Sequence, residues 1–504
     1  MRSKAESAVA RRNGAAFAQK QKKVSLYRKL FKQTAVYGLA TVVPRMLSFF
    51  LVPLYTDLLD EADYGVVTKL FAYMIFFNVV LSYGFETAFF RFVNREPDVE
   101  RVKSTALYSI LFSTTLFGVF AAIQASFLSS FMEVSLTQVY LAIAIMVFDA
   151  LVLVPFSSLR ASQRPGFFAV VKIGNVVLNL LLNLFFLLLL PALAHHNFFA
   201  GLYMPNSEVF YIFVSNLIAS AATFVVLSSD YWKTKYQFDT QLWKKMLQYS
   251  WPILISGIAF AINDQFDKIL LSKLLPESVA DHEVGVYSAC YKLGLFMVLF
   301  RTAYTLGIEP FFFNHAQNEN APQTYAEITR FFVAAGAIIL VGVIVFADVL
   351  KLFMIPNAKY WEAMKIVPLI VLANFCLGIY TNLSIWYKLT DKTIFAAYIS
   401  LIGAAVTLAL NFWLIPLYSY TGSAIATLGA YGSMMLVSYA LGQKYYPIPY
   451  DYRKIGLYLG LAIGLSFVSF YRFRGNIIVA ILAFVSFTAV VVWSERKVFL
   501  KKRA

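Results

Sequence analysis

Fourteen apolar runs of about 20 residues follow one another along this 504-residue chain. A helix rises ~1.5 Å per residue, so about 20 apolar residues cross the ~30 Å hydrocarbon core of a bilayer. With 60% hydrophobic and only 14% charged residues, the chain lacks the charge of a soluble protein. The runs are centred near Leu47, Phe76, Thr115, Val147, Asn183, Leu217, Ala261, Met297, Ile339, Leu372, Val406, Tyr431, Leu461 and Leu482. The pattern predicts an all-α polytopic membrane protein with about 14 transmembrane helices.

The connections between these runs alternate in charge. The even-numbered connections are basic through Arg91, Arg95, Arg101, Lys103, Arg160, Arg164, Lys233, Lys235, Lys244, Lys245, Arg330, Lys388, Lys392, Lys444, Arg453 and Lys454. The odd-numbered connections are poor in base, with the exceptions Lys273, Lys351, Lys359, Lys365, Arg472 and Arg474. Because Lys and Arg accumulate on cytoplasmic loops, both termini are predicted in the cytoplasm. The same rule explains the net charge of +16 without a nucleic-acid partner.

A short sequence recurs at the second and eighth runs. Tyr64-Gly65-Val66 opens the second run and Val284-Gly285-Val286 opens the eighth, each after an acidic connection. The recurrence predicts two six-helix bundles related as parallel repeats, with two helices appended. The predicted segments are a basic cytoplasmic arm with an interfacial helix (1–33), a first bundle (34–230), a basic linker (231–247), a second bundle (248–443), two additional helices (444–495) and a basic cytoplasmic tail (496–504).

Arg45 lies near the middle of the first run, where a guanidinium costs at least ~2.5 kcal/mol. Pro44 and Pro53 can bend this helix, and Pro252 can bend the seventh, which would make both helices moving parts of an alternating-access device. Further charges inside apolar runs are Asp149, Lys172, Asp264, Asp267, Lys268, Lys292, Arg301 and Glu309. Such charges face a wet, protein-lined cavity, so a polar interior is predicted.

The seventh run concentrates polar residues. Asp264 and Lys268 are four residues apart, share one helix face and can neutralise each other. Asp267 lies on the same side, so one acid is left over. Three interpretations stay open for this cluster: structural ion pairing, coupling to a proton or an ion, and contact with substrate.

In the eighth run, Lys292 and Arg301 are nine residues apart and point to opposite faces of a regular helix. Both could line one cavity only if the helix were wound irregularly. Arg301 is deeper and is the preferred cavity residue. Glu309 and Lys69 lie near helix ends and are predicted to snorkel to water.

The fifth run carries a polar stripe of Lys172, Asn175, Asn179 and Asn183, spaced 3, 4 and 4. Amides in lipid must find partners, so the stripe faces other helices or a wet cavity. Interhelical hydrogen bonding and hydrogen bonding to sugar hydroxyls are both open. Asp149 of the fourth run is a partner for either Arg45 or Lys172.

The sequence offers little to an enzyme. Cys290 and Cys376 both fall inside apolar runs, so neither a disulfide framework nor metal-ligand spacing is present. The longest external connection, Pro191–Ser207, contains only His195-His196 as candidate chemistry, and we favour a solvated loop over pH sensing or metal binding for that pair. A membrane glycan polymerase or ligase would need paired carboxylates or a nucleophile in a large external loop. We therefore expect no enzyme activity.

Two groups of motifs resemble the polysaccharide-biosynthesis flippase (Wzx-like) family of the multidrug/oligosaccharidyl-lipid/polysaccharide (MOP) exporter superfamily. In the first half these motifs are Gly38–Arg45, Leu58-Leu59, Tyr64-Gly65-Val66 and Gly84–Phe92. In the second half they are Pro252–Leu254, Asp267–Leu275 and Gly285–Tyr287. The resemblance covers essentially the whole chain and implies a MATE-like arrangement of its helices.

The resemblance implies a flippase that translocates an undecaprenyl-diphosphate-linked oligosaccharide across the bacterial inner membrane for polysaccharide, including lipopolysaccharide, biosynthesis. Arg45, Arg301 and Lys268 would then line a cationic cavity for the diphosphate. Membrane lipid and the lipid-linked oligosaccharide are the expected ligands, a polysaccharide polymerase or glycosyltransferases the expected partners. No cofactor is implied beyond coupling to H⁺ or Na⁺.

The same superfamily supplies the alternatives. Peptidoglycan-precursor flippases have an Arg-Asp pair in the first helix, whereas Met46 follows Arg45 here. Drug exporters rely on acidic pocket residues, and Asp149, Asp264 and Asp267 keep that alternative open. The basic central residues argue against a cationic cargo.

Overall fold

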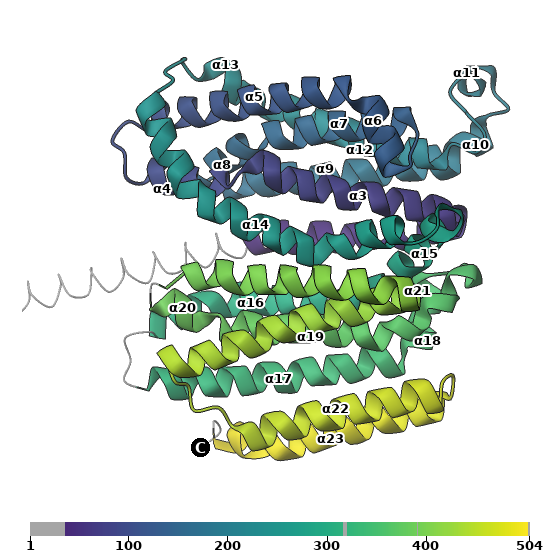
Figure 1. Cartoon of the computed structure of the whole chain (residues 1–504), viewed down its shortest axis with the longest axis vertical. Helices are drawn as coiled ribbons and strands as arrows, with labels where there is room; N and C mark the ends of the chain where they lie inside the picture. Colours follow the sequence, from purple (N-terminus) through teal and green to yellow (C-terminus); the bar gives the residue numbers. More distant parts are fainter. Residues whose placement is uncertain (1–35, 316–319, 391, 502–504) are drawn as a thin grey trace, which may run out of the picture.

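Figure 1 shows the computed structural model of the chain, which describes residues 36–315, 320–390 and 392–501. Every regular element in these ranges is a helix, which confirms the predicted all-α class. The predicted basic arm and its interfacial helix (1–33) lie outside the described residues, and so does the end of the predicted tail (502–504).

The described helices account for all the predicted spans. Twelve of them are long and apolar enough to cross a membrane. One of these, α21 (Ile394–Tyr445), consists of two helices joined at a kink where Ser419 has φ 49° and ψ −136°. A further helix, α14 (Thr240–Leu274), is 35 residues long but carries several charges. Counting α21 twice and adding α14 gives fourteen spans, each at a predicted centre.

The first bundle forms the purple-to-teal layer in Figure 1. Its helices are the first span (Val36–Leu58, ending in α2, Leu51–Leu58), α3 (Glu61–Ser82), α4 (Phe85–Val93), α5 (Val99–Ile123), α6 (Ala125–Met132), α7 (Leu136–Leu151), α8 (Leu153–Ala161), α9 (Pro165–Leu184), a π turn (Phe185–Leu189), α10 (Leu190–Leu193), α11 (Asn197–Ala200), α12 (Glu208–Leu227) and α13 (Ser229–Lys233). A break at Phe50 divides the first span three residues before Pro53, where proline removes a backbone donor.

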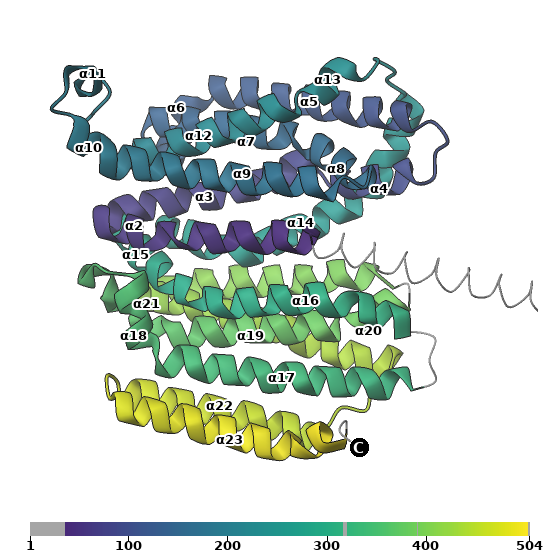
Figure 2. The same ribbon diagram turned by 180° about the vertical axis from the view of Figure 1, so that it is seen from behind.

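The second bundle forms the green layer. After α14 it contains α15 (Glu277–Tyr291), a 3₁₀ turn (Lys292–Gly294), α16 (Leu295–His315), α17 (Ala321–Val345), α18 (Ala347–Met354), a 3₁₀ segment (Ala358–Ile366), α19 (Val367–Leu383), α20 (Ile385–Leu389) and α21. The appended helices α22 (Tyr452–Arg472) and α23 (Ile477–Lys501) pack on α17, as both views show (Figures 1 and 2).

Helix α14 connects the two bundles. Its first turns belong to the first bundle, because Leu242 and Met246 share a core cluster with Phe85 and Phe89 of α4. Beyond Pro252 it packs against α21 and α3, so it runs obliquely from one layer to the other in Figure 1. The predicted linker 231–247 thus includes the beginning of a transmembrane helix.

The bundles meet closely at one end, which we name the acidic end after its connections around Asp60 and Asp281. Here α3 crosses α15 at Gly65 and Gly285, the glycines of the recurring sequence. A Cβ built on Gly65 would overlap the carbonyl of Asp281, and one on Gly285 would overlap the carbonyl of Glu61. The contact is reciprocal, as two related helices crossing near a common axis would make it. The opposite end, which carries the basic connections, is named the basic end.

Candidate functional site

Arg45 lies at the boundary between the two bundles. Its side chain is exposed, and its Nη1 donates a hydrogen bond of 2.7 Å to Thr302 Oγ1 of α16. Gly38, two turns earlier, faces Leu306 of α16. Figure 2 shows this first span, in purple, beside the layer that contains α15 and α16. The guanidinium therefore lies between the two bundles.

The acids and lysine of α14 pair differently from the expected i,i+4 arrangement. Lys268 Nζ contacts the carboxylate of its neighbour Asp267 at 2.9 Å, and Tyr287 donates to the same carboxylate at 2.8 Å. Asp264 instead accepts a hydrogen bond from Gln265 at 2.5 Å. Lys268 and Asp267 are buried, whereas Asp264 is only partly buried. Residue spacing in the sequence could not show that the side chain of Lys268 contacts its neighbour Asp267.

The eighth span is wound irregularly between Lys292 and Arg301. The 3₁₀ turn Lys292–Gly294 separates α15 from α16 and alters the helical phase between the two cations. Lys292 acts electrostatically on Lys268 and on both acids, and Arg301 acts on Arg45.

Asp264 also acts on Arg45. The central cluster, as we use the term, comprises Arg45, Asp264, Asp267, Lys268, Lys292 and Arg301. Glu309 lies in α16, but its side chain is outside the described part of the structure.

A polar cavity of about 560 Å³ opens within the first bundle, beside the helix that carries Arg45. Asp149 accepts a hydrogen bond from Ser220 at 2.7 Å and interacts electrostatically with Lys172, the second of its two expected partners. Asn175 donates to Thr223 at 2.9 Å. The lining residues are Thr41, Pro44, Glu86, Asp149, Val152, Leu153, Phe156, Ser157, Arg160, Phe168, Lys172, Asn175, Val176 and Thr223.

The polar stripe of the fifth span is divided between a cavity and a buried helix contact. Lys172 and Asn175 line this cavity. Asn183 is buried, donates to Asn179 Oδ1 at 2.6 Å and accepts from Tyr55 of α2 at 2.9 Å. Asn183 thus ties α9 to the first span, whereas Lys172 and Asn175 are the stripe residues that face the cavity.

Sequence reasoning missed the ion pair between Arg160 and Glu86 in the same cavity. In the sequence, Arg160 falls in a basic connection and Glu86 within the motif Gly84–Phe92. Their spacing of 74 residues gave no periodic signal, since the contact exists only after α4 and α8 pack together.

Ion pairs join the bundles at the acidic end. Lys69 is fully buried and contacts Asp281 at 2.5 Å, so the prediction that it snorkels to water is wrong. Lys273 contacts Glu133 at 2.7 Å. The hydroxyl of Tyr360 donates to the Asp60 carbonyl at 2.8 Å. Burial at the glycine crossing and these cross-links close the boundary between the bundles at this end.

Three basic residues that are exceptions to the loop-charge pattern lie beside acids. Lys273 contacts Glu133, and Lys351 and Arg474 both contact Asp348, at 2.5 and 3.2 Å.

The fold and the central cluster define a multi-pass helical membrane protein in which two bundles share a charged boundary. The family model described as polysaccharide biosynthesis protein matches residues 30–313, more than half of the chain, and the chain belongs to this family. A comparison with curated proteins finds no significant match.

Solved structures share the fold over nearly their whole length. A structure titled lipid II flippase MurJ, inward closed conformation, aligns with a TM-score of 0.70 at 14% identity, covering 91% of this chain and 99% of that one. Inward- and outward-facing conformations of a multidrug resistance MATE family transporter of the MOP superfamily align with TM-scores of 0.60 and 0.56, at 13% and 12% identity, each covering 85% of this chain and 96% of that one. These matches confirm the expected MATE/MOP-like fold.

Proposed function

We propose that this protein is a flippase that moves an undecaprenyl-diphosphate-linked oligosaccharide across the bacterial inner membrane by alternating access. The observation that carries the proposal is the exposed guanidinium of Arg45, which is placed between the bundles and hydrogen-bonded to Thr302 of the other bundle. Membership of the polysaccharide biosynthesis family supports the substrate class. A transport role rather than catalysis fits a site built from fixed charges between two bodies.

The charge balance of the central cluster favours an anionic cargo. Four cations, Arg45, Lys268, Lys292 and Arg301, are opposed by only two acids, and one of these acids is already paired with Lys268. Clustered cations repel one another in a region of low dielectric, and an anion relieves that repulsion. Arginine holds phosphate oxygens bidentately, so Arg45 and Arg301 are the proposed ligands of the diphosphate.

The cavity of the first bundle supports a place for sugars. Its volume of about 560 Å³ falls within the range of roughly 300–1,000 Å³ typical of small-molecule sites. Its amide, hydroxyl and charged side chains can exchange their present partners for sugar hydroxyls. Thr41 and Pro44 line it from the helix of Arg45, so a sugar there would lie close to a diphosphate held at Arg45.

The closed acidic end supports alternating access. The loop charges support a cytoplasmic location for the basic end. The chain would then be closed to the outside in this conformation, with Arg45 accessible from the inner side. Opening would separate Gly65 from Gly285 and break the Lys69–Asp281 pair, while Pro252 of α14 allows that helix to bend.

A second candidate is a peptidoglycan-precursor flippase or an ion-coupled exporter of the same superfamily. It draws support from the TM-score of 0.70 to the structure titled lipid II flippase and from the partly buried Asp264. Asp264 lies beside the cations without the close pairing of Asp267, which is the position a proton- or Na⁺-coupling carboxylate needs. Coupling to either ion is compatible with both candidates.

Complementation of a flippase-deficient strain tests the proposal. Arg45→Ala should lower surface glycan on the order of 100-fold, as loss of a charged contact worth ~3 kcal/mol predicts, with unchanged membrane abundance. The matched control is Arg95→Ala, an exposed arginine in a connection at the basic end, which should export normally. Normal export by Arg45→Ala would overturn the proposal.

A further inference from the structure

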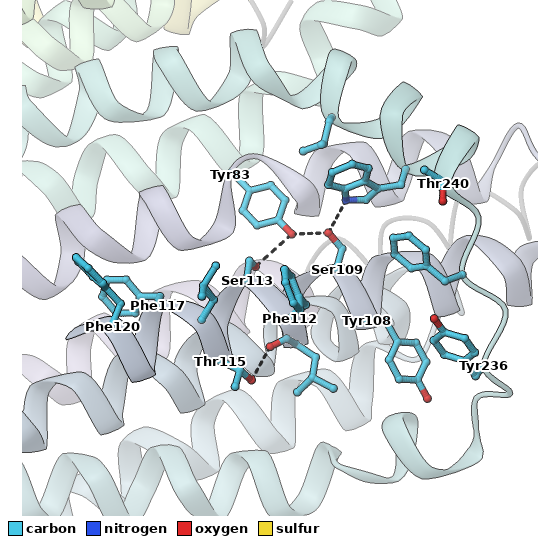
Figure 3. Close-up of a pocket in the computed structure, with 15 residues that line it drawn as sticks. Tyr83, Tyr108, Ser109, Phe112, Ser113, Thr115, Phe117, Phe120, Tyr236 and Thr240 are labelled. Atoms are coloured by element: carbon cyan, nitrogen blue, oxygen red, sulfur yellow. Dashed lines mark hydrogen bonds between the residues drawn. The ribbon is translucent and has the colours of Figure 1, made fainter. Parts of the chain in front are cut away.

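A second, larger pocket lies on the outside of the first bundle, away from the central cluster. It measures about 1190 Å³ and is bounded by α5, the connection before α14 and the first turns of α14 (Figure 3). We name it the α5 groove. Its lining consists of Tyr83, Tyr108, Ser109, Leu111, Phe112, Ser113, Thr115, Leu116, Phe117, Phe120, Tyr236, Phe238, Thr240, Trp243 and Leu247.

The length and polarity of the α5 groove match one leaflet. From Tyr108 to Phe120 an α-helix rises about 18 Å, close to half of the ~30 Å hydrocarbon core. Tyr108, Tyr236 and Trp243 gather toward the basic end, where amphipathic aromatic rings favour the membrane interface. Toward the middle of the membrane the lining is apolar, with Phe112 and Phe120 largely exposed.

The floor of the groove is held by a short hydrogen-bonded chain. Trp243 Nε1 donates to Ser109 Oγ at 2.8 Å, and the hydroxyls of Ser109 and Tyr83 are 2.7 Å apart, as the dashed lines in Figure 3 show. The connection that forms the rim is tied to α5 as well. The backbone N–H of Gln237 donates to Ser104 Oγ at 2.8 Å. The polar groups of the floor and rim are therefore already hydrogen-bonded to one another. The surface that remains for an occupant is apolar.

The rim at the basic end carries positive charge. Lys235 adjoins Tyr236, Lys244 adjoins Trp243, and both lysines are exposed. Neither lysine forms an ion pair with another described residue, in contrast to Lys103, which contacts Asp230 at 2.9 Å. A juxtamembrane lysine attracts anionic headgroups across a distance of about a Debye length.

We propose that an anionic phospholipid of the leaflet at the basic end occupies the α5 groove, with its acyl chain along α5 and its headgroup at Lys235 and Lys244. The walls come from α5 of the first bundle and from the part of α14 before Pro252. The bound lipid fastens the start of α14 to the first bundle, on the near side of the bend through which the second bundle would move. The site is separate from the substrate cavity and does not depend on the proposed cargo.

Native mass spectrometry of the full chain released from nanodiscs tests this site, with phosphatidylglycerol and phosphatidylcholine as the probes. Wild type should retain one tightly held phosphatidylglycerol in preference to phosphatidylcholine. Thr115→Trp places a large side chain in the groove and should abolish that retention. The control Val225→Trp puts the same side chain on an exposed face of α12, where Val225 is 69% exposed, and should retain the lipid.

Charge variants test the headgroup. Lys235→Gln and Lys244→Gln should each lower the preference for phosphatidylglycerol about fivefold, the effect expected of one basic residue at an anionic surface. Equal retention by Thr115→Trp and Val225→Trp would overturn the site. Equal retention of the two phospholipids by wild type would overturn the anionic headgroup. Displacement of phosphatidylglycerol by equimolar undecaprenyl diphosphate would overturn a phospholipid as the occupant.

Discussion

The acidic end and the central cluster both hold charges within the span of the membrane, yet they hold them in different ways. At the acidic end Lys69 and Lys273 each contact one acid of the partner bundle, and Lys69 is completely buried. In the central cluster the cations outnumber the acids, and Arg45 stays exposed. Paired charges can be buried together, whereas an excess of one sign is relieved by an anion. We therefore propose that the acidic end is a gate and the central cluster a binding site.

Substitution of Gly65 at the glycine crossing should have the largest effect on closure of the acidic end. Gly65→Leu should prevent closure at the acidic end and abolish transport, because even a Cβ at this position would overlap the Asp281 carbonyl. Accessibility of an introduced cysteine near Tyr360 to a membrane-impermeant thiol reagent measures closure. Gly174→Leu is the control, since no atom lies within 4 Å of its added Cβ. An inaccessible cysteine in active Gly65→Leu would show that this crossing is not the gate.

Breaking the Lys69–Asp281 pair should have the next largest effect, on the free energy of unfolding. Lys69→Met leaves Asp281 partly buried without its cation and should lower the free energy of unfolding by about 3 kcal/mol, the lower end of the range for a broken buried pair. The double variant Lys69→Met/Asp281→Leu should recover most of that loss, because the unpaired charge is gone. Thermal unfolding in detergent measures both. No recovery in the double variant would mean that the lysine acts through something other than this pair.

Helix α14 contains both kinds of charge, the paired Asp267 and the less closely paired Asp264, so substitutions of these two acids compare them within one helix. Asp267→Asn should reduce thermal stability by roughly 1–3 kcal/mol, since it weakens a buried contact with Lys268 and Tyr287. Asp264→Asn should leave stability nearly unchanged and remove the dependence of transport on an H⁺ or Na⁺ gradient. Transport assays in proteoliposomes with and without each gradient measure the second effect. A gradient response that persists in Asp264→Asn would assign Asp264 to structure alone.

Removing the charge of Asp239, which caps the N-terminus of α14, should have the smallest effect on stability. Asp239 accepts a hydrogen bond from the backbone N–H of Leu242, and this contact, aided by Gln241 and Arg101, holds the pKa of its carboxyl below the usual value despite opposing desolvation. A lowered folded-state pKa means that the stabilisation is present above the unfolded pKa of ~3.9 and is lost as the pH falls through the folded value.

Asp239→Asn should therefore melt slightly below wild type at pH 7. The two melting temperatures should begin to converge below pH ~3.9 and meet once the pH has fallen through the lower pKa of the folded state. Melting curves across that pH range provide the measurement. A difference in melting temperature of the same size at pH 7 and at acidic pH would show that the charge of Asp239 does not stabilise the helix.

The parts of the fold that depend on local sequence could be predicted. Span length and hydropathy are local properties, so all fourteen spans follow from the apolar runs, and even the recurring Gly65 and Gly285 mark a real contact. Pairing in space is not local. The partners of Lys69 and Arg45 lie 212 and 257 residues away, and no periodicity could identify them.

Irregular backbone limited the rest of the prediction. A regular helix would place Lys292 and Arg301 on opposite faces, but a 3₁₀ turn at Lys292–Gly294 changes their relation. Lys268 turned to its immediate neighbour Asp267 instead of the acid one turn away. Side-chain choice among nearby partners depends on burial and on Tyr287, which comes from another helix.

The affinity of the purified protein for undecaprenyl diphosphate, compared with uncharged undecaprenol, tests the central claim most directly. The account predicts a clear preference for the diphosphate in wild type, a reduction of that preference on the order of 10- to 100-fold in Arg45→Ala and in Arg301→Ala, and little change in Lys69→Met. Equal affinity of wild type for the two lipids, or a preference that survives loss of both arginines, would contradict it.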